Sequence, residues 1–341
     1  MGVTANMKQG LVTGGGGFLG RAIVAQLLAL GWKVRCYQRG HYPDLLAAGA
    51  EVWTGDLTDI ENLKQACQGV DTVFHVAAKA GVWGPCEGYF AANVTGTRHV
   101  LEACRANGVQ RLVYTSSPSV VFDGRNHEGI DERTPYATRF LASYPQTKAI
   151  AEQMVLAANS PELATIALRP HLIWGPGDPH HLPRLIARAR SGQLRRISGP
   201  ITVIDATYID NAAHAHLLAL NSLKPGAACA GRAYFIAQGE PVPTWEFIQA
   251  ILEAVGHTQT LPSVPPWLAR LAGAAAEESY RLLGIQHEPP MTRFVAQELT
   301  TSHWFDLKAA RQDLGYTAPV STAEGLRRLA QAHESSHAHH A

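Results

Sequence analysis

The sequence predicts an α/β fold: a doubly wound parallel sheet of the Rossmann type with a smaller C-terminal lobe. In the first half of the chain, short apolar runs of β type alternate with helical patterns, as a parallel sheet requires. A glycine-rich turn joins the first strand to the first helix. We expect residues 8–175 to form the sheet domain, and 176–330 to form mainly a substrate-binding lobe with some segments returning to the sheet.

Six strands follow in order from the apolar pattern. They are expected at 10–14, 32–38, 50–56, 71–78, 111–117 and 165–170. A helix with one apolar face follows the first strand and ends at Gly31, because glycine is a common helix terminator. Further helices are expected over about 91–106 and from Tyr144 onward. A strand at 232–238 is expected to rejoin the main sheet.

Beyond about residue 175, proline and glycine interrupt the pattern, which indicates the smaller lobe. The segment 264–285 has apolar residues at helical spacing and allows two interpretations. One is an amphipathic lid over an apolar substrate channel, in contact with a membrane surface or a partner enzyme. The other is a helix packed on the lobe. Glu277, Glu278 and Arg281 exclude a membrane-spanning helix at this position.

The composition excludes several classes of protein. The formal net charge is +1 without a basic block, so the chain lacks the electrostatic footprint of a nucleic-acid-binding protein. The five cysteines have no C-x-x-C spacing, which favours reduced thiols over disulfides or a zinc site. No apolar run reaches the roughly 18 residues of a membrane span, and the N-terminus lacks a signal-peptide core. We expect a cytoplasmic protein without a metal site, ending in a flexible tail at 331–341.

The glycine-rich turn "VTGGGGFLG" (12–20) predicts a dinucleotide site. Gly14, Gly17 and Gly20 follow a strand and open a helix, which is the context that such a site needs. Glycine lets the backbone approach a pyrophosphate, whose charge then meets the helix N-terminus.

The end of the second strand favours NADP(H) over NAD(H). An acidic side chain usually binds the ribose hydroxyls of NAD at this position, but here the chain has Gln38 and Arg39. A guanidinium binds a 2′-phosphate in a bidentate manner, whereas a carboxylate repels it. The alternative is that Arg39 is a solvated loop cation. Asp56, at the end of the third strand, is placed to meet the adenine.

Further motifs complete a family pattern. They are "HVAA" (75–78), "NVTGT" (93–97), "YTSS" (114–117), "YPQTK" (144–148) and "LRPHLIWGPGD" (168–178). Over about residues 8–220 the chain resembles an extended short-chain dehydrogenase/reductase. The stretches "AAKAGVWG", "YIDNAAHAH" and "HWFDLKAARQDLGY" are similar to its 3β-hydroxysteroid dehydrogenase-like branch. Within that branch it resembles the 2-alkyl-3-oxoalkanoate reductases of bacterial long-chain olefin biosynthesis.

The resemblance implies a catalytic trio. Tyr144 and Lys148 match the Y-x-x-x-K motif, and four residues is about one helical turn, so both side chains share a face. Ser117 matches the catalytic serine, with Ser116 as the alternative because the register is open by one residue. The tyrosine would protonate the alkoxide that hydride transfer leaves, and the ammonium should lower its pKa from near 10. The serine would hold the substrate oxygen.

The resemblance also implies a set of residues around the cofactor. Besides those named above, they are Phe18, Leu19, Leu57, Ala77, Ala78, Lys79, Pro170 and His171. Asn93 either steadies the lysine, as in related enzymes, or has a purely structural role.

The expected substrate is a hydrophobic small molecule, a long-chain 2-alkyl-3-oxo acid that NADPH reduces to the 3-hydroxy acid. Lys79 is the candidate cation for the carboxylate, and Ser117 and Trp174 are further candidate contacts. Three alternatives remain: a 3β-hydroxysteroid or sterol-4α-carboxylate 3-dehydrogenase, a nucleotide-sugar epimerase or dehydratase, and a non-catalytic NADP-sensing protein. Related proteins also suggest a homodimer through the helices at about 91–106 and 146–158.

Overall fold

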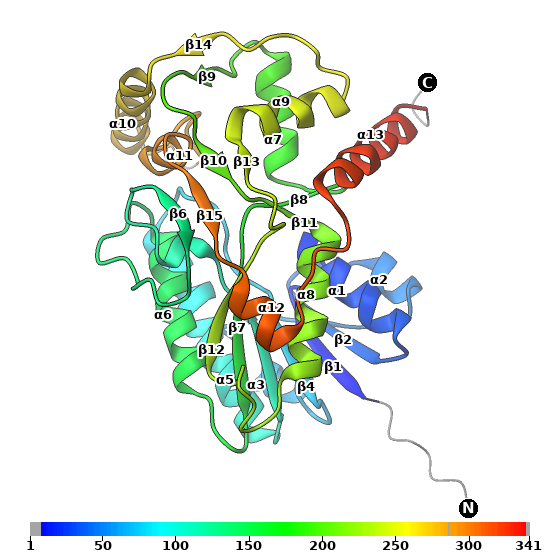
Figure 1. Cartoon of the computed structure of the whole chain (residues 1–341). Helices are drawn as coiled ribbons and strands as arrows, with labels where there is room; N and C mark the ends of the chain where they lie inside the picture. Colours follow the sequence, from blue (N-terminus) through cyan, green and yellow to red (C-terminus); the bar gives the residue numbers. More distant parts are fainter. Residues whose placement is uncertain (1–7, 286, 339–341) are drawn as a thin grey trace, which may run out of the picture.

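A seven-stranded parallel sheet forms the centre of the computed structural model, which describes residues 8–285 and 287–338 (Figure 1). Its strand order is β12-β7-β5-β4-β1-β2-β3. The strands are β1 (Gln9–Thr13), β2 (Lys33–Gln38), β3 (Glu51–Thr54), β4 (Thr72–His75), β5 (Arg111–Thr115), β7 (Ala164–Pro170) and β12 (Arg232–Ile236). The predicted doubly wound sheet is confirmed, including the return of the last strand, which pairs with β7.

Helices cover both faces of this sheet, so its central strands are almost entirely buried. One face carries α1 (Phe18–Ala29), α8 (Ile209–Ser222) and α12 (Lys308–Leu314). The other carries α3 (Ile60–Ala66), α5 (Gly96–Ala106) and α6 (Ser143–Ala157). All seven residues of β7 are buried as a result. The strand order changes direction between β1 and β4, because β2 and β3 lie on one side and β5, β7 and β12 on the other. A ligand crevice is expected at this point, beyond the carboxyl ends of the strands.

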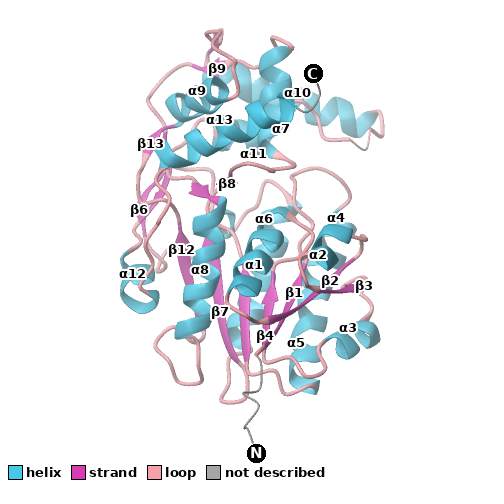
Figure 2. Cartoon of the chain, turned by 90° about the vertical axis from the view of Figure 1, so that its right-hand side faces the viewer, coloured by secondary structure: helices cyan, strands magenta, loops and turns pink. Residues whose placement is uncertain are grey.

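A smaller lobe lies over the carboxyl ends of the main strands (Figures 1 and 2). Its helices are α7 (His181–Arg190), α9 (Thr244–Ala254), α10 (Pro266–Leu282) and α11 (Arg293–Glu298). A mixed sheet joins it to the main domain through β13 (Val242–Pro243), β10 (Val203–Ile204), β15 (His303–Phe305) and β6 (His127–Ile130). Two short pairs complete it: β8 (Ile173–Trp174) with β11 (Thr207–Tyr208), and β9 (Arg196–Ile197) with β14 (Ser263–Val264). Shorter elements are α2 (Pro43–Ala47), α4 (Cys86–Tyr89), a π-helix (Phe90–Thr95) and a 3₁₀ turn (Pro118–Val120).

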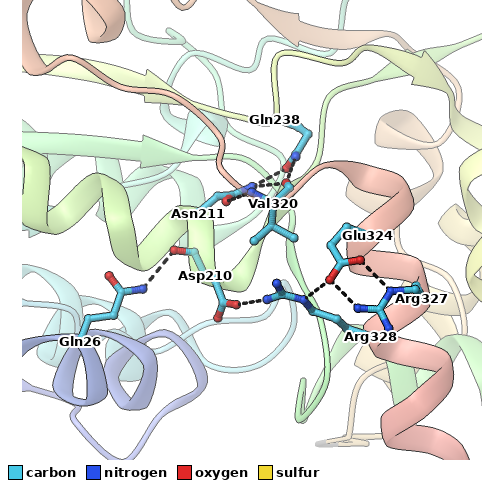
Figure 3. Close-up of polar contacts among 8 residues, drawn as sticks. All are labelled: Gln26, Asp210, Asn211, Gln238, Val320, Glu324, Arg327 and Arg328. Carbon is cyan, nitrogen blue, oxygen red and sulfur yellow. Dashed lines mark hydrogen bonds and ion pairs between the residues drawn. The ribbon is translucent and has the colours of Figure 1, made fainter. Parts of the chain in front are cut away.

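The last helix, α13 (Thr322–Ala338), is tied to the start of α8 by polar contacts (Figure 3). Arg328 donates to the Asp210 carboxylate at 2.9 Å, and Asn211 exchanges two hydrogen bonds with the backbone of Val320. Residues 331–338 of the expected flexible tail at 331–341 continue this helix, and 339–341 lie outside the described residues.

The segment at 264–285 forms α10, which packs on α11 through small residues. It therefore lies on the lobe, as one of the two interpretations predicted, but its large apolar side chains point to solvent. None of the helices in the described part of the chain has the length and hydropathy that crossing a bilayer requires.

Candidate active site

The glycine-rich turn is shaped by two close backbone approaches. Gly14 has a φ of +69°, and a Cβ there would lie 2.9 Å from the Ala77 Cα at the end of β4. A Cβ on Gly20 would collide with the Gly14 carbonyl oxygen, so only glycine lets α1 pack this closely on β1. Gly17 is the N-cap of α1, and no side chain caps the helix. Its first N–H groups can therefore bind an anion.

Gln38 and Arg39 face different environments at the end of β2. Gln38 is buried, and its Oε1 accepts a hydrogen bond from the Gly16 N–H at 2.5 Å. This contact holds the glycine-rich turn in place. Arg39 is exposed and forms no ion pair within the described residues. Hydrogen bonds from Thr58 hold the pKa of Asp56 below its usual range, and the charge of Arg39 adds to this effect. Arg39 and Asp56 thus lie near each other, beyond the carboxyl ends of β2 and β3.

Four of the remaining cofactor candidates lie in different surroundings. Leu19 is buried in the core that α1 shares with the sheet, while Phe18 is partly buried beside it. Leu57 is buried against Gly96, where an added Cβ would lie 2.8 Å from the Leu57 Cβ. Ala78 is exposed beyond the end of β4.

Asn93 fixes the turn after β4 to the catalytic helix. Its Oδ1 accepts from the Lys79 N–H at 2.7 Å, and its Nδ2 donates to the Thr147 hydroxyl at 3.0 Å. Thr147 directly precedes Lys148 on α6. The π-helix around Asn93 turns the amide into this position, as π-bulges often do at functional sites. These direct contacts give Asn93 a positioning role.

Tyr144 and Ser117 are brought together by α6 and the end of β5. The Ser117 hydroxyl lies close enough to the Tyr144 phenol to lower the pKa of the phenol, and it lies 2.9 Å from the Ser119 hydroxyl. The Ser116 hydroxyl is buried and has no partner among the described residues. The geometry therefore favours Ser117 over Ser116 as the partner of the tyrosine.

Lys148 is buried one turn further along α6. Its Nζ donates to the Thr115 carbonyl oxygen at 2.5 Å and lies 4.1 Å from the centre of the Tyr114 ring. Burial lowers the pKa of Lys148 to about 7, and the nearby Glu152 carboxylate opposes this shift. The ammonium is thus directed at a backbone carbonyl of β5.

The phenol of Tyr144 differs from the sequence-based expectation. Burial raises its pKa to about 12, and the hydrogen bond with Ser117 opposes this shift. Lys148 is not among the groups that act on this pKa, so the expected lowering by the ammonium is not observed. The Lys148 ammonium instead donates a hydrogen bond to the Thr115 carbonyl oxygen. The Tyr144 phenol stays protonated at neutral pH.

Glu298, at the end of α11, is a site residue that the sequence analysis missed. Its carboxyl acts electrostatically on Tyr144, and burial raises the pKa of Glu298 to about 8. It is therefore neutral at pH 7. No spacing or motif signals this residue, because it reaches the site from a helix more than 150 residues along the chain from Tyr144.

The ammonium of Lys79 lies beside the catalytic residues without a carboxylate partner. It is 4.6 Å from the centre of the Tyr89 ring, and Tyr89 itself acts on the pKa of Tyr144. No ion pair to Lys79 exists within the described ranges. A cation stabilised only by an aromatic ring is available for an anionic ligand.

The segment after β7 contains one expected contact that the structure does not support. Pro170 is buried at the strand end. The His171 ring donates from Nδ1 to the Asp205 carbonyl at 2.9 Å, and burial lowers its pKa to about 4. Trp174 is only 2% exposed, because it packs edge-on against the rings of Tyr208 and Phe247. The expectation that Trp174 contacts substrate is corrected: it is a core residue.

Comparisons with known proteins agree with this geometry. The chain is 50% identical to a 2-alkyl-3-oxoalkanoate reductase of Shewanella oneidensis over 96% of its length and 87% of the relative. It is 33% identical to the human sterol-4-alpha-carboxylate 3-dehydrogenase, decarboxylating, over 95% of its length and 88% of that protein. The solved structure of MoeE5 with UDP-glucuronic acid and NAD aligns with a TM-score of 0.73 at 26% identity, covering 96% of this chain and 99% of MoeE5.

The model of one protein family matches residues 11–265, which include the glycine-rich turn, Ser117, Tyr144 and Lys148. The chain belongs to the 3-beta hydroxysteroid dehydrogenase/isomerase family and is an oxidoreductase with the short-chain dehydrogenase/reductase fold.

Proposed function

We propose that this protein is an NADPH-dependent reductase of long-chain 2-alkyl-3-oxo acids, forming the 3-hydroxy acids that lead to long-chain olefins. The observation that carries the proposal is the position of the Tyr144 phenol beside the Ser117 hydroxyl, where burial raises the pKa of the phenol to about 12. A reduction needs a proton donor at this place, and a phenol with a raised pKa is in the donor form at neutral pH. The similarity to the reductase of Shewanella oneidensis supports the same substrate class.

A dinucleotide fits the turn at the end of β1. The close packing that Gly14 and Gly20 permit brings the N–H groups of α1 to the surface, where a pyrophosphate would bind. The NAD bound in the MoeE5 structure supports a nicotinamide cofactor. The exposed, unpaired Arg39 supports a 2′-phosphate, which makes NADPH the preferred form.

The chain's own residues account for the proton transfer. A bound nicotinamide would supply the hydride to the ketone carbon. Ser117 would donate a hydrogen bond to the ketone oxygen, and Tyr144 would pass its phenolic proton to the oxygen as negative charge develops. A proton from solvent would then restore the phenol, while Lys148 keeps its hydrogen bond to the Thr115 carbonyl one turn away on α6.

Two ionisable groups suit an acidic substrate. Glu298 is neutral at pH 7, so it places no fixed negative charge beside Tyr144. Lys79 supplies a cation that no carboxylate neutralises within the described residues. A substrate carboxylate near the ketone would thus meet attraction at Lys79 and little repulsion at Glu298.

A substrate panel tests the proposal directly. We expect NADPH oxidation with long-chain 3-oxo acids, faster when a 2-alkyl branch is present, and little NADP⁺ or NAD⁺ reduction with 3β-hydroxysteroids. Efficient oxidation of a 4α-carboxysterol would instead favour the activity named for the human relative. Turnover of neither class would favour a non-catalytic role.

Replacement of Lys79 by alanine should weaken binding of the acid selectively. We expect KM for a 3-oxo acid to rise by about tenfold or more, because a charge-assisted contact of about 1.5–3 kcal/mol is lost. KM for a neutral methyl ketone of the same chain length should change less than twofold. Equal increases for both substrates would remove Lys79 from carboxylate binding.

Replacement of Arg39 by glutamate should reverse the cofactor preference. We expect KM for NADPH to rise by about 10–100-fold, because a phosphate contact becomes a repulsion, while KM for NADH stays the same or falls. Lys33→Glu is the matched control, since this exposed cation lies at the opposite end of β2. An Arg39→Glu enzyme with unchanged KM for NADPH would show that Arg39 is only a solvated loop cation.

A further inference from the structure

Helix α10 buries small and polar residues and exposes large apolar ones, which is the reverse of an ordinary surface helix. The face that packs on α11 consists of Ala269, Gly273 and Glu277, spaced four residues apart. A Cβ on Gly273 would lie 2.9 Å from the Thr292 carbonyl oxygen, and Glu277 accepts from the Arg293 N–H at 2.6 Å. Small and polar contacts thus hold the helix in place, and its large apolar residues are not needed for folding.

Those large residues point to solvent. Trp267, Leu271 and Leu282 lie on the face opposite the buried one, and they are 65%, 58% and 80% exposed. The remaining members of this surface are Leu268, Leu283 and Ile201. Together these six make up two thirds of the nine large apolar side chains that are exposed in the described part of the chain. A clustering of this kind marks an interaction surface.

Ile201 joins the surface because its loop packs against the start of α10. A Cβ on Gly199 would lie 3.2 Å from Pro266, and β9 pairs with β14 directly before the helix. Ser198, Pro200 and Thr202, which flank Ile201 in this loop, line a common hollow with Pro266. We call the six apolar residues on α10 and this loop the apolar rim. It occupies the outer edge of the lobe, which Figure 2 shows projecting beyond the main domain.

Positive charge accompanies the apolar rim. Between residues 179 and 203 the chain has five arginines and neither aspartate nor glutamate. Arg195 and Arg196 are exposed beside β14, and Arg270 is exposed on the first turns of α10. None of these three forms an ion pair with another described residue. Apolar side chains bordered by unpaired arginines complement the surface of a membrane that contains anionic lipid.

We propose that the apolar rim rests on an anionic lipid bilayer, with Trp267, Leu271 and Leu282 inserted among the lipid chains and Arg195 and Arg196 at the headgroups. If the proposed function holds, the substrate would also come from the membrane. A long-chain acid with a second alkyl branch partitions strongly into lipid. Unpaired arginines would contribute less to an interface with a second copy of this chain.

The surface is connected to the catalytic region. The Trp83 ring packs edge-on against Tyr280 near the end of α10, at 6.2 Å between centres, and its Nε1 donates to the Ile285 carbonyl. Trp83 lies in the loop that begins with Lys79. The helix that would enter the lipid therefore borders the loop that carries the candidate carboxylate-binding cation.

Vesicle co-sedimentation of the full chain tests the proposal without substrate or cofactor, so its outcome is independent of the proposed reaction. The probes are vesicles of phosphatidylglycerol and phosphatidylethanolamine in equal parts, and vesicles of phosphatidylcholine alone. We expect binding to the anionic vesicles that weakens at high salt. The double variant Trp267→Ser/Leu271→Ser should lower vesicle affinity by about tenfold or more, and Arg195→Glu/Arg196→Glu should abolish the preference for anionic lipid.

Leu30→Ser is the matched control, because Leu30 is 61% exposed at the end of α1 on the main domain. It should bind vesicles as the unaltered protein does, and all variants should keep their melting temperature. Absence of binding to anionic vesicles, or equal binding by the Trp267→Ser/Leu271→Ser variant, would overturn the proposal. So would a dimer in sedimentation velocity that this variant dissociates, because the rim would then be a protein interface.

Discussion

Replacement of Tyr144 by phenylalanine should lower kcat by about 10²–10⁴, the usual contribution of a general acid. The phenyl ring keeps the packing of the partly buried side chain and removes only the hydroxyl that Ser117 contacts. We expect KM for NADPH and the melting temperature to stay close to those of the unaltered enzyme. Single-turnover measurements with saturating NADPH should locate the loss in the chemical step rather than in product release.

Tyr280→Phe is the control, since this tyrosine lies on α10 and only its ring contacts Trp83. It should keep full activity. A Ser117→Ala variant should lose activity as Tyr144→Phe does, and the two losses should combine to less than their product, because both groups act on the same oxygen. Full activity of Tyr144→Phe with a 3-oxo acid would refute the proposed proton donor.

The sequence predicted those features that depend on neighbouring residues. The strands, the glycine-rich turn and the Tyr144–Lys148 pair each arise within one element or one connection, so local spacing is enough to find them. Ser117 was found for the same reason, although its distinction from Ser116 required the three-dimensional contact with Tyr144.

Features formed between distant segments were not predictable in this way. Glu298 comes near Tyr144 only because α11 packs through Phe294 on Phe122, which follows β5, and Lys148 of α6 binds a carbonyl of strand β5. Trp174 was assigned to the substrate because it follows a strand end near the cleft, but α9 and β11 cover it. The sequence left two interpretations of α10 open, because apolar residues at helical spacing suit both packing on the lobe and contact with a membrane or partner.

Replacement of one partner of the buried Glu152–Arg169 ion pair, which joins α6 to β7, should strongly lower stability. Glu152, on α6, is fully buried and accepts three hydrogen bonds from Arg169 of β7, the shortest at 2.6 Å. The Tyr136 hydroxyl also donates to it at 2.7 Å. Glu152→Gln should lower the free energy of unfolding by about 3–5 kcal/mol, because the Arg169 guanidinium would remain charged, buried and unpaired. Urea denaturation at pH 7 measures this change.

Two further variants separate the charge of this pair from its volume. Glu162→Gln, on an exposed carboxylate of the loop before β7, should change the free energy of unfolding by less than about 0.5 kcal/mol. The double variant Glu152→Met/Arg169→Met should recover much of the lost stability, because the buried carboxylate and the buried guanidinium are removed together. It should not recover full activity, since Glu152 also favours the charged form of Lys148. A Glu152→Gln protein as stable as the unaltered one would show that the pair is not required to hold α6 on β7.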